Sequence, residues 1–259
     1  MKVPYLYLIP LMAGLAPTSS QAAVTLVSGY SSFSSNGGGV VESNLGGSNL
    51  SFSLPSNGST VNPNGSLTVP QQGSGAKTSI NISSLNLSKD TGFTINLNFL
   101  SATNLDNQDS LFCLSTSNNQ NAYIGRYENT NKVGMAVDGS TGGRPGEAVS
   151  SVIDFTQPFS LTLSVSGGKT SIFVTSGGIT QEIFWNNKTN SGTPSSLILG
   201  AWGSLDGNRS GVTLSGISFW EGAATMDDIT GIINVPEPGS ASLALLGIGG
   251  IMLRRKRTR

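Results

Sequence analysis

The chain of 259 residues is rich in glycine, only 11% charged, and lacks histidine, which excludes a Ser-His-Asp catalytic triad. Its single cysteine, Cys113, excludes an intrachain disulfide and a cysteine-based zinc site. Six of the 14 basic residues lie at the ends of the chain: Lys2 and five in the C-terminal tail. The part between holds eight basic and 13 acidic residues, a net charge of about −5. This negative charge disfavours nucleic acid as a partner.

Residues 1–22 are predicted to be a secretory signal peptide. Lys2 precedes an apolar stretch from about Tyr5 to Ala16, and Ser20 and Ala22 fit the −3 and −1 positions of a cleavage site. A buried N-terminal strand, the alternative, explains neither the lysine nor the small residues at those two positions. The sequence therefore predicts that the protein is exported.

Residues 23–234 are predicted to form the exported domain, and its first part, residues 23–75, is dense in Ser, Gly and Asn. Leu50, Phe52 and Leu54 alternate with serines, which is typical of a half-buried strand. We therefore expect loosely ordered first strands joined by long turns. Disorder of part of residues 29–48 is the alternative.

From residue 78 onward, apolar residues alternate with polar ones in short runs, a pattern that predicts β-strands. Two Gly-Gly pairs, at 167–168 and 177–178, supply the positive φ angles that tight hairpin turns need. Strands are expected at Ile80–Leu87, Phe93–Phe99, Ser110–Ser117, Tyr123–Tyr127, Val133–Val137, Phe159–Val165, Ile172–Val174, Ile179–Trp185, Leu197–Leu199 and Val212–Trp220.

A short helix is predicted to close the domain after the last strand. Thr225 and Asp228 have the spacing of a capping box, with Thr225 as the N-cap. Ile229, Ile232 and Ile233 then fall on one face of the helix, which we expect to pack on the domain.

The C-terminal segment, residues 235–259, combines a Pro-Glu-Pro turn, an apolar stretch and a basic tail. Gly239–Leu253 would span about 22 Å as a helix, short of the ~30 Å hydrocarbon core, so a stop-transfer role fits better than a permanent anchor. The turn is Val235, Pro236, Glu237 and Pro238, and the basic cluster is Arg254, Arg255, Lys256, Arg257 and Arg259.

These three parts, in this order, resemble a PEP-CTERM sorting signal. The resemblance implies processing near the Pro-Glu-Pro turn by an exosortase-type enzyme of a Gram-negative bacterium. It also implies delivery to the cell surface or extracellular matrix, after a transient hold in the inner membrane by a short transmembrane helix. An ordinary short tail anchor is the alternative, and it likewise predicts an exported protein held at a membrane.

The order of strands and the closing helix resemble a laminin-G-like, concanavalin A-like jelly roll. The resemblance is carried by Phe93–Phe99, Leu161–Val174, Leu197–Gly200 and Gly216–Ile229. The expected fold class is thus all-β, a two-sheet antiparallel β-sandwich with one short C-terminal helix. Other two-sheet sandwiches with similar strand spacing stay open.

Glycoside hydrolases of this architecture carry acidic residues two apart on one strand, so that both carboxylates share a face. The sequence contains no such pair on a predicted strand. Asp106 with Asp109, in a polar loop, and Asp227 with Asp228, at the helix cap, are the nearest acidic pairs. A non-enzymatic protein is therefore favoured, with a glycan-cleaving hydrolase as the alternative.

The laminin-G resemblance also implies a calcium site in loops rich in Asp and Asn. The candidate ligands are Asp106, Asp109 and Asp206. Aspartates in such loops also serve turn geometry alone, which is the other interpretation.

Sugar binding requires aromatic platforms beside polar groups. Candidates at strand–loop edges are Trp185, Trp202, Tyr123 and Tyr127, although aromatic rings in a sandwich often belong to its core. The predicted function is an exported surface or matrix protein that binds glycan or matrix without catalysis. A purely structural matrix component is a further alternative.

Overall fold

The computed structural model describes residues 24–56, 58–71, 77–103, 105, 109–116, 121–127, 130–138, 147–148, 152–167, 169–186, 193–201 and 210–233. The predicted signal peptide and the predicted sorting segment lie outside these ranges. Within them, no helix has the length and apolar character needed to cross a bilayer.

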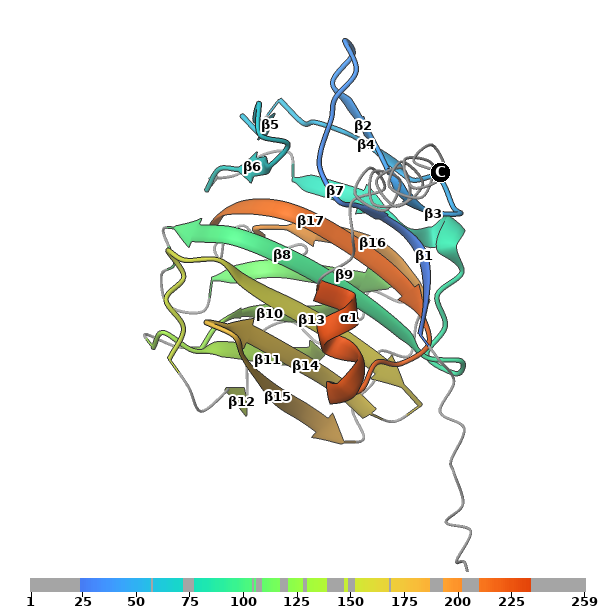
Figure 1. Ribbon diagram of the computed structural model, residues 1–259, viewed down its shortest axis with the longest axis vertical. Coiled ribbons are helices and arrows are strands. Elements are labelled where there is room, and N and C mark those ends of the chain that lie inside the picture. The colour runs from blue at the N-terminus through green and yellow to red at the C-terminus, as the bar shows by residue number, and fades with distance from the viewer. Residues whose placement is uncertain are drawn as a thin grey trace, which may run out of the picture.

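The larger of two main sheets has nine strands in the order β15-β14-β13-β8-β17-β1-β3, with β6 beside β17 and β5 beside β6 (Figure 1). Its long central strands β8 and β17 pair along most of their length. The bounds are β1 (Thr25–Tyr30), β3 (Leu45–Gly46), β5 (Thr60–Val61), β6 (Leu67–Val69), β8 (Phe93–Thr103), β13 (Phe159–Ser166), β14 (Lys169–Ser176), β15 (Ile179–Asn186) and β17 (Gly211–Glu221).

The second main sheet has six strands in the order β12-β11-β10-β9-β16-β7, and a two-stranded sheet pairs β2 with β4. Every pairing among the described strands is antiparallel. The bounds are β2 (Val40–Glu42), β4 (Ser51–Ser53), β7 (Thr78–Asn81), β9 (Ser110–Thr116), β10 (Asn121–Arg126), β11 (Val133–Asp138), β12 (Glu147–Ala148) and β16 (Pro194–Leu199).

The core lies between the two main sheets and is filled by the apolar side chains at alternate positions of their strands. In β8, Ile95 and Leu97 face inward and are fully buried, as are Leu161 in β13 and Leu197 in β16. Each such side chain contributes about 1.5–3 kcal/mol when it leaves water. The structure thus confirms the predicted all-β sandwich with antiparallel sheets.

The Ser/Gly/Asn-rich first part of the domain also contributes to this core. Residues 29–48 all lie within the described structure, and Tyr30, Phe33 and Phe52 are buried together. The ring of Tyr30 stacks on Phe33 at 5.6 Å and meets Phe52 edge-on at 5.7 Å. Burial of the Tyr30 hydroxyl raises its pKa well above the usual value. The alternation seen in this segment therefore marks side chains that pack.

One predicted strand is wrong in its second half. Strand β7 ends at Asn81, and Ser83–Leu85 form a 3-10 turn where Ile80–Leu87 were expected to be extended. The side chain of Asn81 accepts hydrogen bonds from the backbone N–H and hydroxyl of Ser83, which turns the chain. Leu85 and Leu87 are nevertheless buried. The apolar pattern thus predicted correctly that these side chains are buried, but not the conformation of the backbone.

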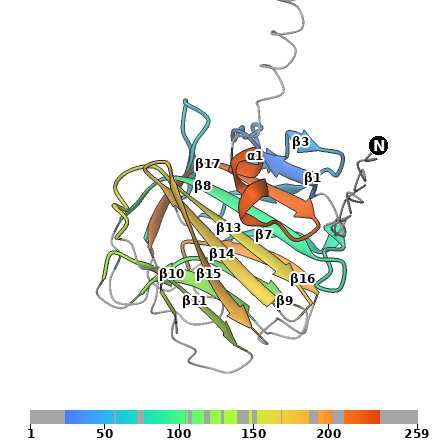
Figure 2. The same ribbon diagram turned by 60° about the horizontal axis from the view of Figure 1, so that its bottom comes forward.

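The closing helix is confirmed. A 3-10 turn η2 (Met226–Asp228) leads into α1 (Ile229–Ile233), and the Asp228 carboxylate accepts the N–H of Thr225 at 2.8 Å and its hydroxyl at 2.7 Å. The helix lies against the outer face of the nine-stranded sheet (Figures 1 and 2). Its buried residues Ile229 and Ile232 form an apolar cluster with Phe173, Ala224 and Trp220.

Candidate functional site

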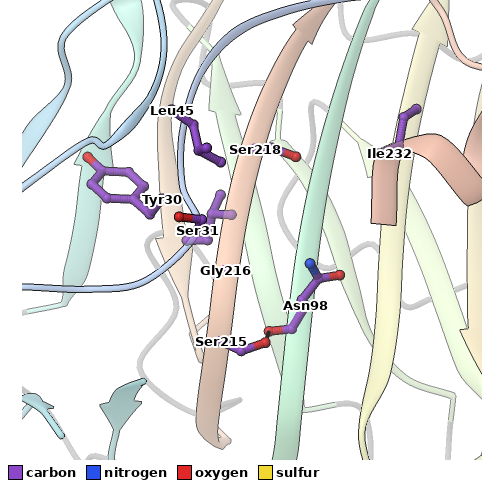
Figure 3. Close-up of a pocket in the computed structure, with 9 residues that line it drawn as sticks. Tyr30, Ser31, Leu45, Asn98, Ser215, Gly216, Ser218 and Ile232 are labelled. Atoms are coloured by element: carbon purple, nitrogen blue, oxygen red, sulfur yellow. Dashed lines mark hydrogen bonds between the residues drawn. The ribbon is translucent and has the colours of Figure 1, made fainter. Parts of the chain in front are cut away.

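A hollow of about 240 Å³ lies on the outer face of the nine-stranded sheet, at the edge of α1 (Figure 3). We call it the outer-face groove. Strands β1, β17 and β8 form its floor, β3 contributes one wall and α1 the other. Its lining residues are Tyr30, Ser31, Leu45, Asn98, Ser215, Gly216, Ile217, Ser218 and Ile232.

An irregularity in β17 shapes the groove. Leu214 pairs with Phe99 and Gly216 with Asn98, so Ser215 is an extra residue with no partner on β8. A side chain at Gly216 would begin 2.9 Å from the carbonyl oxygen of Tyr30, closer than real Cβ atoms come to such an atom. The glycine therefore lets β1 approach β17 and leaves the floor of the groove open.

The polar groups of the groove are amide and hydroxyl groups. No hydrogen bond to another described residue occupies the Asn98 side chain, whereas the Ser215 hydroxyl donates to the Asn98 carbonyl oxygen at 3.4 Å. Ser31 donates its N–H to the Asn44 side-chain oxygen at 2.8 Å. None of the described residues that line the groove is charged. The lining suits an uncharged ligand that both donates and accepts hydrogen bonds.

Asn96 is buried beside the groove, at 1% exposure. Its amide nitrogen donates to the hydroxyls of Ser160 at 2.7 Å and Thr162 at 3.0 Å, while its amide oxygen has no partner. Asn96 pairs across the strands with Ser218, which lines the groove and accepts the indole N–H of Trp220 at 2.8 Å. Because an unpaired buried acceptor costs about 1–3 kcal/mol, the Asn96 amide is a costly feature of the outer face.

The predicted aromatic platforms do not meet at this groove. Tyr123, in β10, pairs with Cys113 and packs with Cys113, Ile198 and Ala201, a cluster set apart from the main core. Tyr127 follows the end of β10 and is half-buried. Both tyrosines thus lie in or next to the six-stranded sheet, away from the groove.

Of the two predicted tryptophans, the structure describes only the backbone of Trp185. The backbone of Trp185 pairs with Thr170 at the edge of the nine-stranded sheet, so it lies on a different sheet from the tyrosines. Trp202 lies outside the described residues. A role for the four aromatic residues in sugar binding stays a prediction.

Among the predicted calcium ligands, Asp109 is described, and it is buried immediately before β9 with 2% exposure. Its carbonyl oxygen accepts the N–H of Arg126 at 2.9 Å. The Arg126 guanidinium group donates to the carbonyl oxygens of Leu105 and, at 2.7 Å, Thr130, and so ties two loops together.

Asp106 and Asp206 lie outside the described residues. Within the described ranges, no group of three or more acidic, cysteine or histidine side chains could hold a metal ion. The calcium site therefore stays a prediction.

The groove was not predicted from the sequence. Its residues come from β1, β3, β8, β17 and α1, and the one local signal is the alternation of polar and apolar residues in NLNF of β8 and ISF of β17. Such alternation is common to most half-buried strands, so it does not single out a binding surface.

Comparison with protein families finds the PEP-CTERM protein-sorting motif at residues 234–257. This match includes the residues Val235–Pro238 of the Pro-Glu-Pro motif and confirms the resemblance drawn from the sequence. The motif indicates export and sorting to the cell-surface side. A search of the curated proteins finds no match to this chain.

Solved structures share the architecture. The Trypanosoma rangeli sialidase in complex with sialic acid has a TM-score of 0.55 at 15% identity, over 79% of this chain and 32% of the sialidase. The botulinum neurotoxin serotype D/C binding domain has a TM-score of 0.51 at 12% identity, over 75% of this chain and 49% of that domain. The chain spans less than half the length of either protein, and at these identities the likeness concerns the fold alone.

Proposed function

We propose that this protein is a non-enzymatic component of the cell surface or extracellular matrix that binds neutral glycan through the outer-face groove. Residues 1–22 direct export, residues 23–234 form the binding domain and residues 235–259 form the sorting signal. The apolar stretch of that signal holds the chain transiently in the inner membrane. An exosortase-type enzyme then processes the chain near Val235–Pro238.

The observation that carries the binding proposal is the uncharged lining of the groove. Asn98 and Ser215 offer an amide and a hydroxyl group between the apolar walls Leu45 and Ile232. Sugars present hydroxyl groups together with apolar ring faces, and such mixed lining is typical of small-ligand sites.

The same lining argues against hydrolysis, because glycosidases need two carboxyl groups about 5–10 Å apart. It also argues against acidic sugars such as the sialic acid held by the Trypanosoma rangeli sialidase. A carboxylate ligand would be bound best by an arginine or lysine, and no described lining residue is either.

Calorimetric titration of the full chain, in a detergent without a sugar headgroup, tests the groove with neutral oligosaccharides of glucose, mannose and xylose. Ser215→Ala and Asn98→Ala should each weaken binding about 5- to 10-fold, because each removes a hydrogen bond worth ~1 kcal/mol. Ser79→Ala, an exposed serine on strand β7 of the other sheet, is the matched control and should bind normally. A folded protein that binds none of these sugars would indicate a structural matrix role.

Intact-mass measurement of protein recovered from the cell surface tests the sorting step. The mature chain should end near Val235 and lack the basic cluster at its C-terminus. Surface protein that retains Arg254–Arg259 would contradict processing by an exosortase-type enzyme.

A further inference from the structure

The outer-face groove is one end of a longer polar row on the nine-stranded sheet. The strand registers pair Thr180 of β15 with Thr175 of β14, then Thr175 with Ser160 of β13, and Ser160 with Asn98 of β8. Asn98 pairs in turn with Gly216 on the floor of the groove. Figure 1 shows these five strands side by side. We call this line of residues the polar row.

The polar row crosses the strands at right angles to their length. Adjacent strands lie ~4.8 Å apart, so the four steps from β15 to β17 cover about 19 Å. Thr180, Thr175 and Asn98 are each partly exposed along this line. The hydroxyls of Thr175 and Thr180 lie 2.9 Å apart and bond to each other. The row therefore places a hydroxyl or amide group on each of its first four strands, with the Ser160 hydroxyl recessed between its partly exposed neighbours at 7% exposure.

Ser160, in the middle of the row, is oriented by the buried amide of Asn96. The Ser160 oxygen accepts the Asn96 N–H at 2.7 Å, which leaves the hydroxyl hydrogen of Ser160 available as a donor. The Asn96 amide thus orients the Ser160 hydroxyl as a hydrogen-bond donor beside Asn98.

The charged residues on the described part of β14 and β15 are paired with each other. Lys169 and Glu182 form an ion pair at 3.1 Å, and Ser171 donates a further hydrogen bond to Glu182 at 2.7 Å. On the same side, Phe173 pairs with both Thr162 and Glu182 and packs beneath α1. The apolar cluster under α1 therefore borders the polar row.

We infer that the polar row and the outer-face groove together bind an extended, unbranched and uncharged polysaccharide chain that runs across the strands. Successive sugars of an extended chain advance by roughly one strand spacing, so each sugar meets the polar residue of one strand. This inference rests on the proposed function and adds its substrate class. The occupant is a polymer rather than a mono- or disaccharide, because the row is several sugars long.

The test is calorimetric titration of the full chain, in the same detergent, with linear β-1,4-linked glucose, mannose and xylose oligomers of two, four and six units. Affinity for at least one series should rise tenfold or more from two to six units. The double variant Thr175→Ala/Thr180→Ala should lose this gain with length and keep the wild-type affinity for the dimer. Asn98→Ala should weaken binding at every length.

Thr60→Ala, an exposed threonine on β5, is the control and should behave as wild type with all oligomers. Far-ultraviolet circular dichroism verifies that each variant is folded. Binding that depends on Asn98 but not on chain length would overturn this inference and leave the proposed function intact. A hexamer affinity unchanged in the double variant would overturn it as well. Absence of binding to every oligomer by the folded wild-type chain would overturn both.

Discussion

The outer face of the nine-stranded sheet has two unlike halves. In one half, Phe173 and Trp220 lie under α1 and pack with Ile229 and Ile232. In the other half, amide and hydroxyl groups such as that of Asn98 remain uncovered along the polar row. Both halves are made by the same strands with the same alternation. The outward-facing residues therefore decide which part of the sheet needs a covering helix and which part can contact a ligand.

The sharpest contrast lies within one strand, at neighbouring residues on opposite faces. Leu97→Ala should lower the free energy of unfolding by about 2–5 kcal/mol, because Leu97 is fully buried between the sheets. Asn98→Ala should change it by no more than ~0.5 kcal/mol, because Asn98 is partly exposed and makes no side-chain bond to a described residue. Urea denaturation measures both. Equal losses would show that the polar row serves packing, and the binding proposal would lose its basis.

The next prediction concerns the half of the outer face that α1 covers. Ile229→Ala should lower the free energy of unfolding by about 2 kcal/mol, at the low end for a buried isoleucine, because a terminal helix can adjust around the gap. The same denaturation experiment measures it. A value near zero would mean that α1 is not held by its apolar contacts, and the outer face would then not divide into two halves.

The cap of the helix gives a smaller effect. Asp228→Ala removes the carboxylate that accepts both the N–H and the hydroxyl of Thr225, and should cost about 1 kcal/mol. Asp228→Asn retains an acceptor oxygen and should cost less. Thermal unfolding of the two variants provides the comparison, and indistinguishable melting temperatures would show that the acceptor oxygen retained by asparagine contributes nothing at this cap.

The smallest expected effect is an increase in the free energy of unfolding. Gly231 lies exposed in α1 at a negative φ, and an added Cβ would meet no atom within 4 Å. Gly231→Ala should therefore raise the free energy of unfolding by about 0.4–1 kcal/mol by restricting the unfolded chain. A destabilised variant in thermal unfolding would indicate that α1 needs the freedom of glycine.

Much of the fold could be predicted because its signals are local. Alternation in Phe93–Phe99 identified a strand and its inward face, and the spacing of Thr225 and Asp228 identified the start of a helix. The same reasoning wrongly predicted a strand at Leu85 and Leu87. Buried residues alternate there, but the side chain of Asn81 binds Ser83 and turns the backbone. Apolar periodicity reports which side chains leave water, and it reports backbone shape only when no side chain competes for the backbone groups.

The all-β class, the short closing helix and the sorting motif at residues 234–257 could each be predicted from local sequence, since each depends on residues close together in the chain. The position of β17 between β8 and β1, which brings Ser31, Asn98 and Ser215 to one groove, follows from the folded domain. Backbone hydrogen bonds can join any two extended segments. Side chains dictate which face of a strand is buried, whereas the identity of its neighbours follows from the packing of the whole domain.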